Sequence, residues 1–319
     1  MKYCMEDDKM AITAAMVKEL REMTGAGMMD CKKALNETNG NMDEAVEFLR
    51  KNGQAKAEKK ASRIAAEGLC AVVTADEKTA AVVEVNSETD FVAKNETFQE
   101  FVKAVAKQAV NSDAADLDAF LAEAWNEDSS KTVNDALVEK VAVIGENLKI
   151  RRFEKVVAEN GCVATYVHGG GRIGVIVDAE TSVVNDAVKE ALVNIAMQIA
   201  ALNPKYVSRD EVSAEYIAHE KEILLAQIMN DPKESQKPEK VINGMIEGRI
   251  SKELKEICLV DQVYVKAEDG KQTVAKYLDE VSKAVGSAVK VKRFVRFETG
   301  EGIEKKQEDF AAEVAAQMK

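Results

Sequence analysis

A unit of strand, turn, strand and helix occurs twice in this chain of 319 residues, and the repeat limits the folds that the chain can adopt. The first copy begins at Glu67-Gly68 and the second at Asn160-Gly161. In each copy β-branched strands precede a stretch whose apolar residues recur at helical spacing. Both copies close on a basic and aromatic strand, at residues 149–153 and 290–294. We therefore predict an α+β fold with two similar core lobes, each a small antiparallel sheet backed by helices.

An insertion of a different pattern interrupts the second copy. Two apolar helical stripes lie within residues 208–257, and Pro232 and Pro238 stand in the polar stretch between them. This pattern predicts an antiparallel helical hairpin that projects from the fold and leaves apolar surface available for self-association. We place the first lobe at residues 63–159, the second at residues 160–207 plus 258–300, and a C-terminal helical module at residues 301–319.

Residues 10–62 read as a three-helix bundle followed by a linker. Each helix carries one apolar stripe, Gly25 and Gly27 separate the first two, and Asn52-Gly53 is expected to end the third. The stretch after Gly53 is rich in Ala, Lys and Glu without a wide apolar face, which is typical of a helical linker. We therefore expect the bundle to move relative to the lobes.

The turn between the first two helices carries Met28 and Met29. Methionine is soft and adaptable, so the pair suits a protein interface, but it also serves as core filler beneath a bundle. Both interpretations remain open from the sequence.

The corner between strand and helix at residues 86–94 is the strongest candidate for a binding tip. Thr89, Asp90, Phe91 and Val92 place an acid and an aromatic side by side where a buried strand pattern ends. Loops held between rigid elements are where binding residues concentrate. The alternative is that Thr89 or Asp90 caps the following helix and Phe91 belongs to the core.

Composition restricts the class of partner. Lys and Arg total 44 against 56 for Asp and Glu, giving a net charge of -12, which disfavours direct nucleic-acid or anionic-membrane binding. Five dispersed cysteines and two histidines show no zinc-site spacing and fit a reducing cytoplasm. No stretch is long and apolar enough to predict a membrane span.

The sequence also argues against an enzyme. Residues 169–174 match the glycine pattern of dinucleotide-binding folds, but a strand rather than a helix follows, so they predict a hairpin turn. His168 has no evident nucleophile partner, and we find no acid–base pair, metal site or cofactor site. The basic and aromatic strands suit either RNA stacking or charged sheet edges that block aggregation.

Five stretches, in order, resemble the elongation factor Ts family: residues 20–35, 84–94, 144–147, 168–174 and 296–305. The likeness runs from Met10 to the end of the chain and implies a cytoplasmic guanine nucleotide exchange factor for the GTPase elongation factor Tu. It implies an amino-terminal bundle of the ubiquitin-associated type.

The resemblance also assigns roles to residues. The tip Thr89 to Val92 wedges beside the GTPase's magnesium site, and Ile144 and His168 contact the same domain. Met28, Met29 and the C-terminal helix grip another face, and the hairpin supports a homodimer in some members. Gln198 stands where the family often has histidine, which leaves any contact there open. The rival functions are a ubiquitin-associated-type adaptor and a ribosome- or RNA-associated binding factor.

Overall fold

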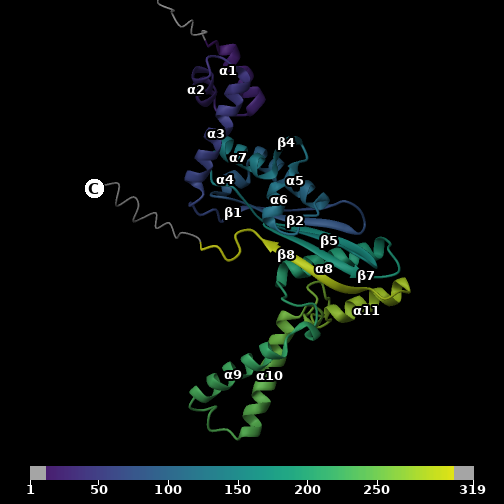
Figure 1. Cartoon of the computed structure of the whole chain (residues 1–319). Coiled ribbons are helices and arrows are strands. Elements are labelled where there is room, and N and C mark those ends of the chain that lie inside the picture. Colours follow the sequence, from purple (N-terminus) through teal and green to yellow (C-terminus); the bar gives the residue numbers. More distant parts are fainter. Residues whose placement is uncertain (1–11, 305–319) are drawn as a thin grey trace, which may run out of the picture.

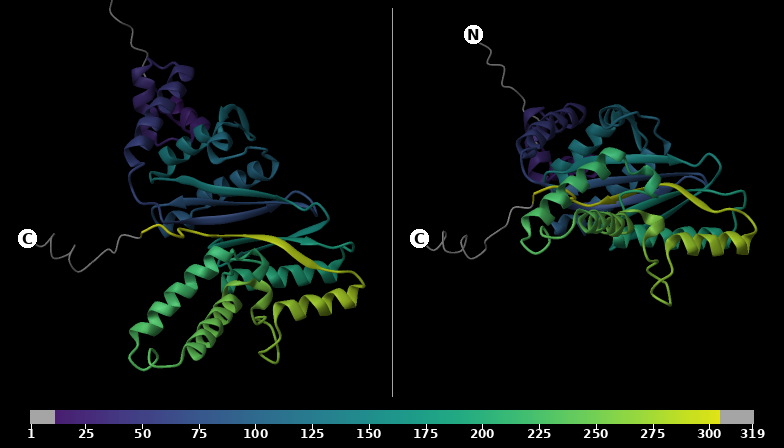
Figure 2. Two further views of the ribbon diagram at one scale, coloured as in Figure 1. Left: turned by 60° about the horizontal axis from the view of Figure 1, so that its bottom comes forward. Right: turned by 90° about the horizontal axis from the view of Figure 1, so that it is seen from below.

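Two three-stranded antiparallel sheets lie face to face at the centre of the molecule, and helices cover their outer faces (Figure 1, Figure 2). The computed structural model describes residues 12–304. The first sheet has the order β1-β2-β5 and the second the order β6-β7-β8, so the two lobes share one topology. The strands are β1 (Glu67–Thr74), β2 (Thr79–Ser87), β5 (Lys149–Val157), β6 (Gly161–His168), β7 (Ile173–Glu180) and β8 (Lys290–Glu298). The predicted α+β class with two small antiparallel sheets is confirmed.

Three apolar layers hold the lobes together. Cys70, Val82, Ile176 and Phe297 belong to the layer between the sheets. A second layer lies between the first sheet and α5 (Glu96–Asn111), and a third between the second sheet and α8 (Asp186–Leu202). The remaining helices and strands of the lobes are α4 (Asp90–Ala93), α6 (Leu117–Ala122), β3 (Ala124–Trp125), β4 (Asp128–Thr132), α7 (Val133–Ile144), the 3₁₀ turns Arg209–Glu211 and Leu259–Asp261, and α11 (Val274–Val285).

The repeated glycines occupy equivalent places in the two lobes. Gly68 and Gly161 have φ of +126° and +152°, in the region that favours glycine. A Cβ at Gly68 would lie 2.2 Å from the Val85 carbonyl oxygen, and one at Gly161 would lie 2.0 Å from that of Ala179. Each glycine therefore allows the first strand of its sheet to approach the second.

The basic residues of the two closing strands also have a common structural role. Arg152 stands opposite Glu84 across the β2–β5 pair, and Arg293 stands opposite Asp178 across the β7–β8 pair. Both acids are buried, and the arginine forms an ion pair with the acid in each lobe. Neutralising a buried acid therefore explains these arginines better than RNA stacking or the blocking of sheet edges.

The bundle consists of α1 (Ala14–Thr24), α2 (Met28–Glu37) and α3 (Met42–Lys60) around a core that includes Leu20, Cys31 and Leu35. The prediction that Asn52-Gly53 ends the third helix is wrong, because α3 continues to Lys60. Gly53 is buried where α3 crosses α7. The absent side chain serves close packing there rather than a helix end.

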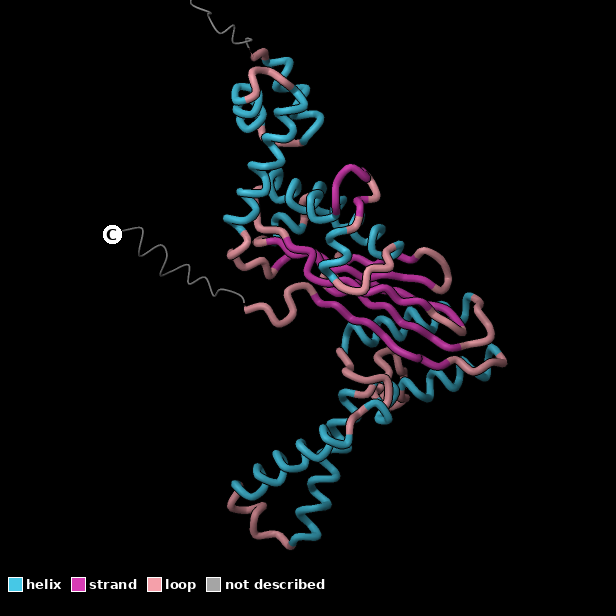
Figure 3. Tube along the Cα trace, viewed as in Figure 1, coloured by secondary structure: helices cyan, strands magenta, loops and turns pink. Residues whose placement is uncertain are grey.

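The predicted hairpin projects from the second lobe as α9 (Ala214–Asn230) and α10 (Glu239–Ile257) (Figure 1, Figure 3). Ile228, Ile242 and Ile246 are buried between the two helices. None of the helices within residues 12–304 is both long and apolar enough to cross a lipid bilayer. The predicted C-terminal helix falls almost entirely within residues 305–319, outside the described residues.

Candidate functional site

The tip formed by Thr89, Asp90, Phe91 and Val92 follows directly from β2 and begins the single-turn helix α4. Thr89 is the N-cap of α4, and its side chain accepts a hydrogen bond from the Val92 backbone N–H. The alternative role of Thr89 as a helix cap is therefore confirmed. The companion expectation of a core phenylalanine is wrong, because Phe91 is 80% exposed.

The base of the tip is held by the loop that follows α7. Gly145 ends α7 with φ of +87°, which turns the chain so that Glu146 reaches the tip. The Glu146 carboxylate accepts hydrogen bonds from the backbone N–H groups of Glu88 and Thr89 at 3.0 and 3.1 Å, and from the Thr89 hydroxyl at 2.7 Å. Hydrogen bonds to a charged acceptor are the stronger kind. The Phe91 side chain is thus presented to solvent on a fixed base.

Replacing Glu146 with alanine should loosen the tip while leaving the lobe folded. The two backbone N–H groups and the Thr89 hydroxyl would lose their common hydrogen-bond acceptor. Leaving donors that are shielded from water unpaired costs about 1–3 kcal/mol of stability. We expect faster hydrogen exchange at the backbone amides of Glu88 and Thr89 and little change in the β2 amides. Glu100→Ala, at an exposed position of α5 in the same lobe, is the matched control. Unchanged exchange at Thr89 would show that Glu146 does not hold the tip.

The two exposed side chains of the tip differ in chemistry. The Lys94 ammonium donates a 2.7 Å hydrogen bond to Asp90 and holds the pKa of that carboxyl below its ordinary value. Asp90 is therefore ionised at neutral pH. Phe91 presents an apolar ring beside this charge, and Val92 is half-buried against the lobe core. The tip offers volume and negative charge together.

The remaining predicted residues lie on three different elements. Met28 and Met29 are 60% and 77% exposed at the start of α2, so the alternative that they fill the bundle core is wrong. Ile144 is the last residue of α7 and is half-buried against the first lobe. His168 is exposed at the end of β6, with Nδ1 3.0 Å from the Tyr166 hydroxyl.

Ile144, the tip and the start of the methionine turn come together around the end of α7. Glu146, two residues beyond Ile144, holds the tip, and Gly25 in the methionine turn lies against Val143, where an added Cβ would be 3.6 Å away. The turn after His168 sits further off, beside β1, where the Cys70 N–H donates to the Gly171 carbonyl at 2.6 Å. It lies at the same end of the sheets, because β1 begins there and β2 ends there.

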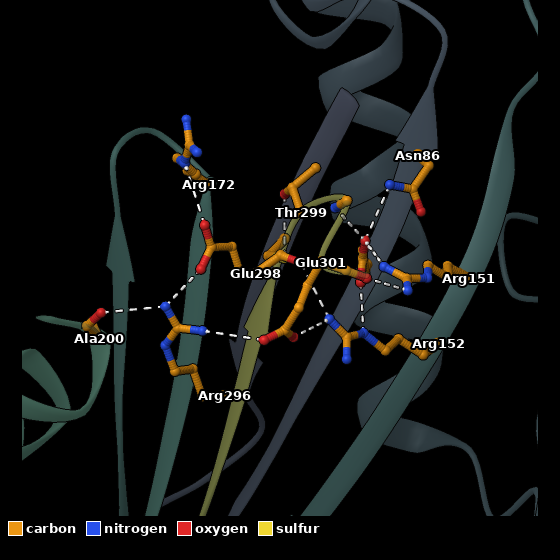
Figure 4. Close-up of polar contacts among 12 residues, drawn as sticks. Asn86, Arg151, Arg152, Arg172, Ala200, Arg296, Glu298, Thr299 and Glu301 are labelled. Atoms are coloured by element: carbon orange, nitrogen blue, oxygen red, sulfur yellow. Dashed lines mark hydrogen bonds and ion pairs between the residues drawn. The ribbon is translucent and has the colours of Figure 1, made fainter. Parts of the chain in front are cut away.

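A cluster centred on Glu84 is the part of the site region that sequence reasoning missed (Figure 4). The fully buried Glu84 carboxylate accepts hydrogen bonds from Arg151 at 2.9 Å, Arg152 at 2.6 Å and the Gly300 N–H at 2.8 Å. Burial raises the pKa of the Glu84 carboxyl, but these donors outweigh it and hold the pKa below its ordinary value. The cluster ties the strand that leads to the tip to the segment after β8. The one sequence signal was an acid inside a strand of apolar residues.

Gln198 is a buried structural residue rather than an exposed contact. Its amide donates to the Gln262 side chain at 3.1 Å and to the Val263 carbonyl at 3.0 Å. Its oxygen accepts from the Val265 N–H at 2.7 Å. Gln198 therefore fixes the segment after α10 onto α8.

An exposed phenylalanine beside an ionised acid, on a loop braced by charged hydrogen bonds, is typical of a site that docks into another protein. Residues 12–304 contain no group of three or more His, Cys, Asp or Glu side chains placed to hold a metal ion. The fold is that of an α+β protein with two repeated lobes, and its exposed tip has the features of a docking surface.

Comparison with known proteins identifies the family. The family model described as Elongation factor TS matches residues 88–301. The chain is 55% identical over 309 residues to Elongation factor Ts of Clostridioides difficile (strain 630), covering 97% of this chain and 99% of that protein. It is 52% identical over 308 residues to Elongation factor Ts of Clostridium novyi (strain NT), covering 96% and 99%. The chain belongs to the elongation factor Ts family.

Proposed function

We propose that this protein is a cytoplasmic guanine nucleotide exchange factor of translation elongation. It binds elongation factor Tu in the GDP form, promotes GDP release without itself catalysing a chemical reaction, and leaves the partner ready to bind GTP. The family membership supports this assignment. The observation that carries it is the exposed Phe91 ring on a tip fixed by Glu146.

The tip is suited to disturb a magnesium and phosphate site in the partner. Magnesium requires near-ideal octahedral geometry, and the groups around its ligands orient them. Phe91 supplies volume that separates partner elements. Asp90 supplies a negative charge that repels phosphate and attracts the donors that held it. Thr89 and Val92 anchor the tip so that its displacement by the partner is disfavoured.

Displacing GDP requires more free energy than one loop supplies. A shift from about 1% to 99% nucleotide-free partner needs roughly 5.5 kcal/mol of differential affinity. We therefore assign Met28, Met29, Ile144 and His168 to further contacts that spread the interface over the bundle and both lobes. Coupling is reciprocal, so GDP must weaken the binding of this protein to the same degree.

Stopped-flow release of a fluorescent GDP from elongation factor Tu tests the proposal. The intact chain should accelerate release in a saturable manner and lower GDP affinity at least about fivefold, the lower end of typical couplings. An adaptor would bind the partner without releasing nucleotide. An RNA-associated factor would instead bind RNA with an affinity that falls steeply with salt. Either outcome without faster release would overturn the proposal.

A further inference from the structure

The bundle is joined to the first lobe by more than the chain connection. Gly53 of α3 faces α7, where an added Cβ would lie 3.6 Å from the Ala142 Cβ and 3.8 Å from a Val138 methyl carbon. Ala57, one turn further along α3, packs against the core of the first lobe. Figure 1 shows α3 running from the bundle down beside α7. The helix thus belongs to both the bundle and the lobe.

Polar contacts reinforce this crossing at both ends. The Lys60 ammonium donates to the Gly145 carbonyl, one of the backbone carbonyls at the C-terminal end of α7. Arg50 lies 3.7 Å from Glu139 on α7. In addition, Gly25 of the methionine turn lies against Val143 of α7. We call these contacts between α3, the methionine turn and α7 the α3–α7 bracket.

The same helix α7 that holds the bundle also holds the tip. At the C-terminal end of α7 the chain continues through Ile144 and Gly145 to Glu146, whose carboxylate accepts a hydrogen bond from the Thr89 hydroxyl. The positions of the exposed Met28–Met29 pair and of the exposed Phe91 are therefore both fixed relative to α7. A flexible linker would instead let the two contact surfaces adopt many relative positions, at an entropic cost on binding.

We propose that the α3–α7 bracket, with Gly53 at its crossing, is a positioning device that presents the methionine pair and the Phe91 tip to the partner as one preorganised surface. This inference rests on the proposed exchange function. Gly53 touches no partner in this scheme; it acts by allowing α3 to approach α7. A bundle held in this way would not move relative to the lobes, contrary to the expectation from the sequence.

Two substitutions at Gly53 separate packing from helix propensity. Gly53→Ala adds a Cβ at ordinary contact distance and improves helix propensity, so the bracket should be kept. Gly53→Leu improves propensity equally but overfills the space against Val138 and Ala142, which should push α3 away from α7. Gly248→Leu on α10, where an added Cβ meets nothing within 4 Å, is the control for a leucine in an open helical position.

The functional readout is the concentration dependence of GDP release. Gly53→Leu should raise the half-saturating concentration on the order of tenfold, as expected when two linked contacts lose their fixed geometry, and should leave the maximal release rate unchanged. In a Met28→Ala, Met29→Ala background the same change should have no further effect. An effect that persists in that background, or none in the wild-type background, would overturn the proposal.

A measurement of bundle orientation keeps this inference separate from the exchange function. Spin labels on Lys18→Cys in α1 and Asp113→Cys in the first lobe, with Cys4→Ser, should give a narrow distance distribution by pulsed electron resonance. Both positions are exposed, and the four cysteines at 31, 70, 162 and 258 are buried. Gly53→Leu should broaden the distribution, and Gly53→Ala and Gly248→Leu should not. A broad distribution in the otherwise unchanged chain would refute the bracket whatever the exchange assay shows.

Discussion

Phe91→Ala should slow partner-stimulated GDP release by about 30-fold to several hundredfold at limiting concentration. Truncating a central interface aromatic typically costs about 2–4 kcal/mol, and each 1.4 kcal/mol is tenfold. The loss of exchange activity should be large because the exposed Phe91 ring does not pack in the lobe core and is free to contact the partner. Stopped-flow release of fluorescent GDP measures it directly.

Folding stability provides the control for Phe91. Because the ring is 80% exposed, Phe91→Ala should change the free energy of unfolding by no more than about 0.5 kcal/mol. Val263→Ala, another exposed apolar side chain but in the second lobe, should alter neither stability nor exchange. If the Phe91→Ala variant had an unfolded lobe, or if it stimulated GDP release as well as the wild type, Phe91 would not be the residue that disturbs the partner's nucleotide site.

Asp90 is expected to contribute through its charge. Asp90→Ala should also slow release, since the ion pair with Lys94 lies on an exposed helix face and adds little to stability. The Phe91→Ala effect and the Asp90→Ala effect need not add, because the two side chains are adjacent.

The tip could be predicted from the sequence because its signals are local. Thr89 to Val92 interrupt a strand pattern immediately before a helical one, and both patterns lie within a few residues of the interruption. The repeated glycines at 68 and 161 mark the two lobes for a similar reason. Each is needed by the geometry of its own hairpin.

Gly53 shows where local signals fail. A glycine after asparagine is a common helix end, and nothing nearby in the sequence contradicts that interpretation. The deciding contacts come from Val138 and Ala142, far along the chain, and they turn a helix-ending residue into a packing residue. Tertiary contact therefore overrides local preference, and the third helix continues past Gly53 into the stretch predicted as a helical linker.

The cluster around Glu84 was hidden for the same reason. Apart from Asn86 on the same strand, its partners come from β5 and from the segment after β8, more than 60 residues away along the chain. A sequence shows one acid in a strand and separate arginines elsewhere. Only the sheet register reveals that Glu84 and Arg152 stand opposite each other.

The largest effect on stability is expected from Glu84→Ala. Removing one partner of a buried ion pair leaves the other charge uncompensated, which costs about 3–5 kcal/mol. Arg151, Arg152 and the Gly300 N–H would all lose their shared acceptor. A domain of ordinary stability has about 5–15 kcal/mol in total, so the first lobe could approach its unfolding threshold at 37 °C. Urea unfolding followed by the fluorescence of Trp125, the sole tryptophan and a core residue of this lobe, measures the loss.

Two variants separate the buried carboxylate from its surroundings. Glu301→Ala removes the outer acid of the same cluster, whose side chain is 42% exposed, and should cost at most about 1 kcal/mol. Glu84→Gln keeps the shape and an acceptor for the Gly300 N–H, so it should fold even if Glu84→Ala does not. A loss below about 1 kcal/mol for Glu84→Ala would mean that the cluster does not hold the lobe, because that is the range of an exposed pair.

The pH dependence of the same variants tests the charge itself. The folded pKa of Glu84 lies below the ordinary value of 4.5, so the folded state binds its proton less readily than the unfolded state. The stability that Glu84 contributes is therefore complete above pH 4.5 and is lost as the pH falls towards the folded pKa. The stability gap between the wild type and Glu84→Gln should narrow in that window. A gap that stayed constant would assign the effect to packing and hydrogen bonds rather than to the ionised carboxylate.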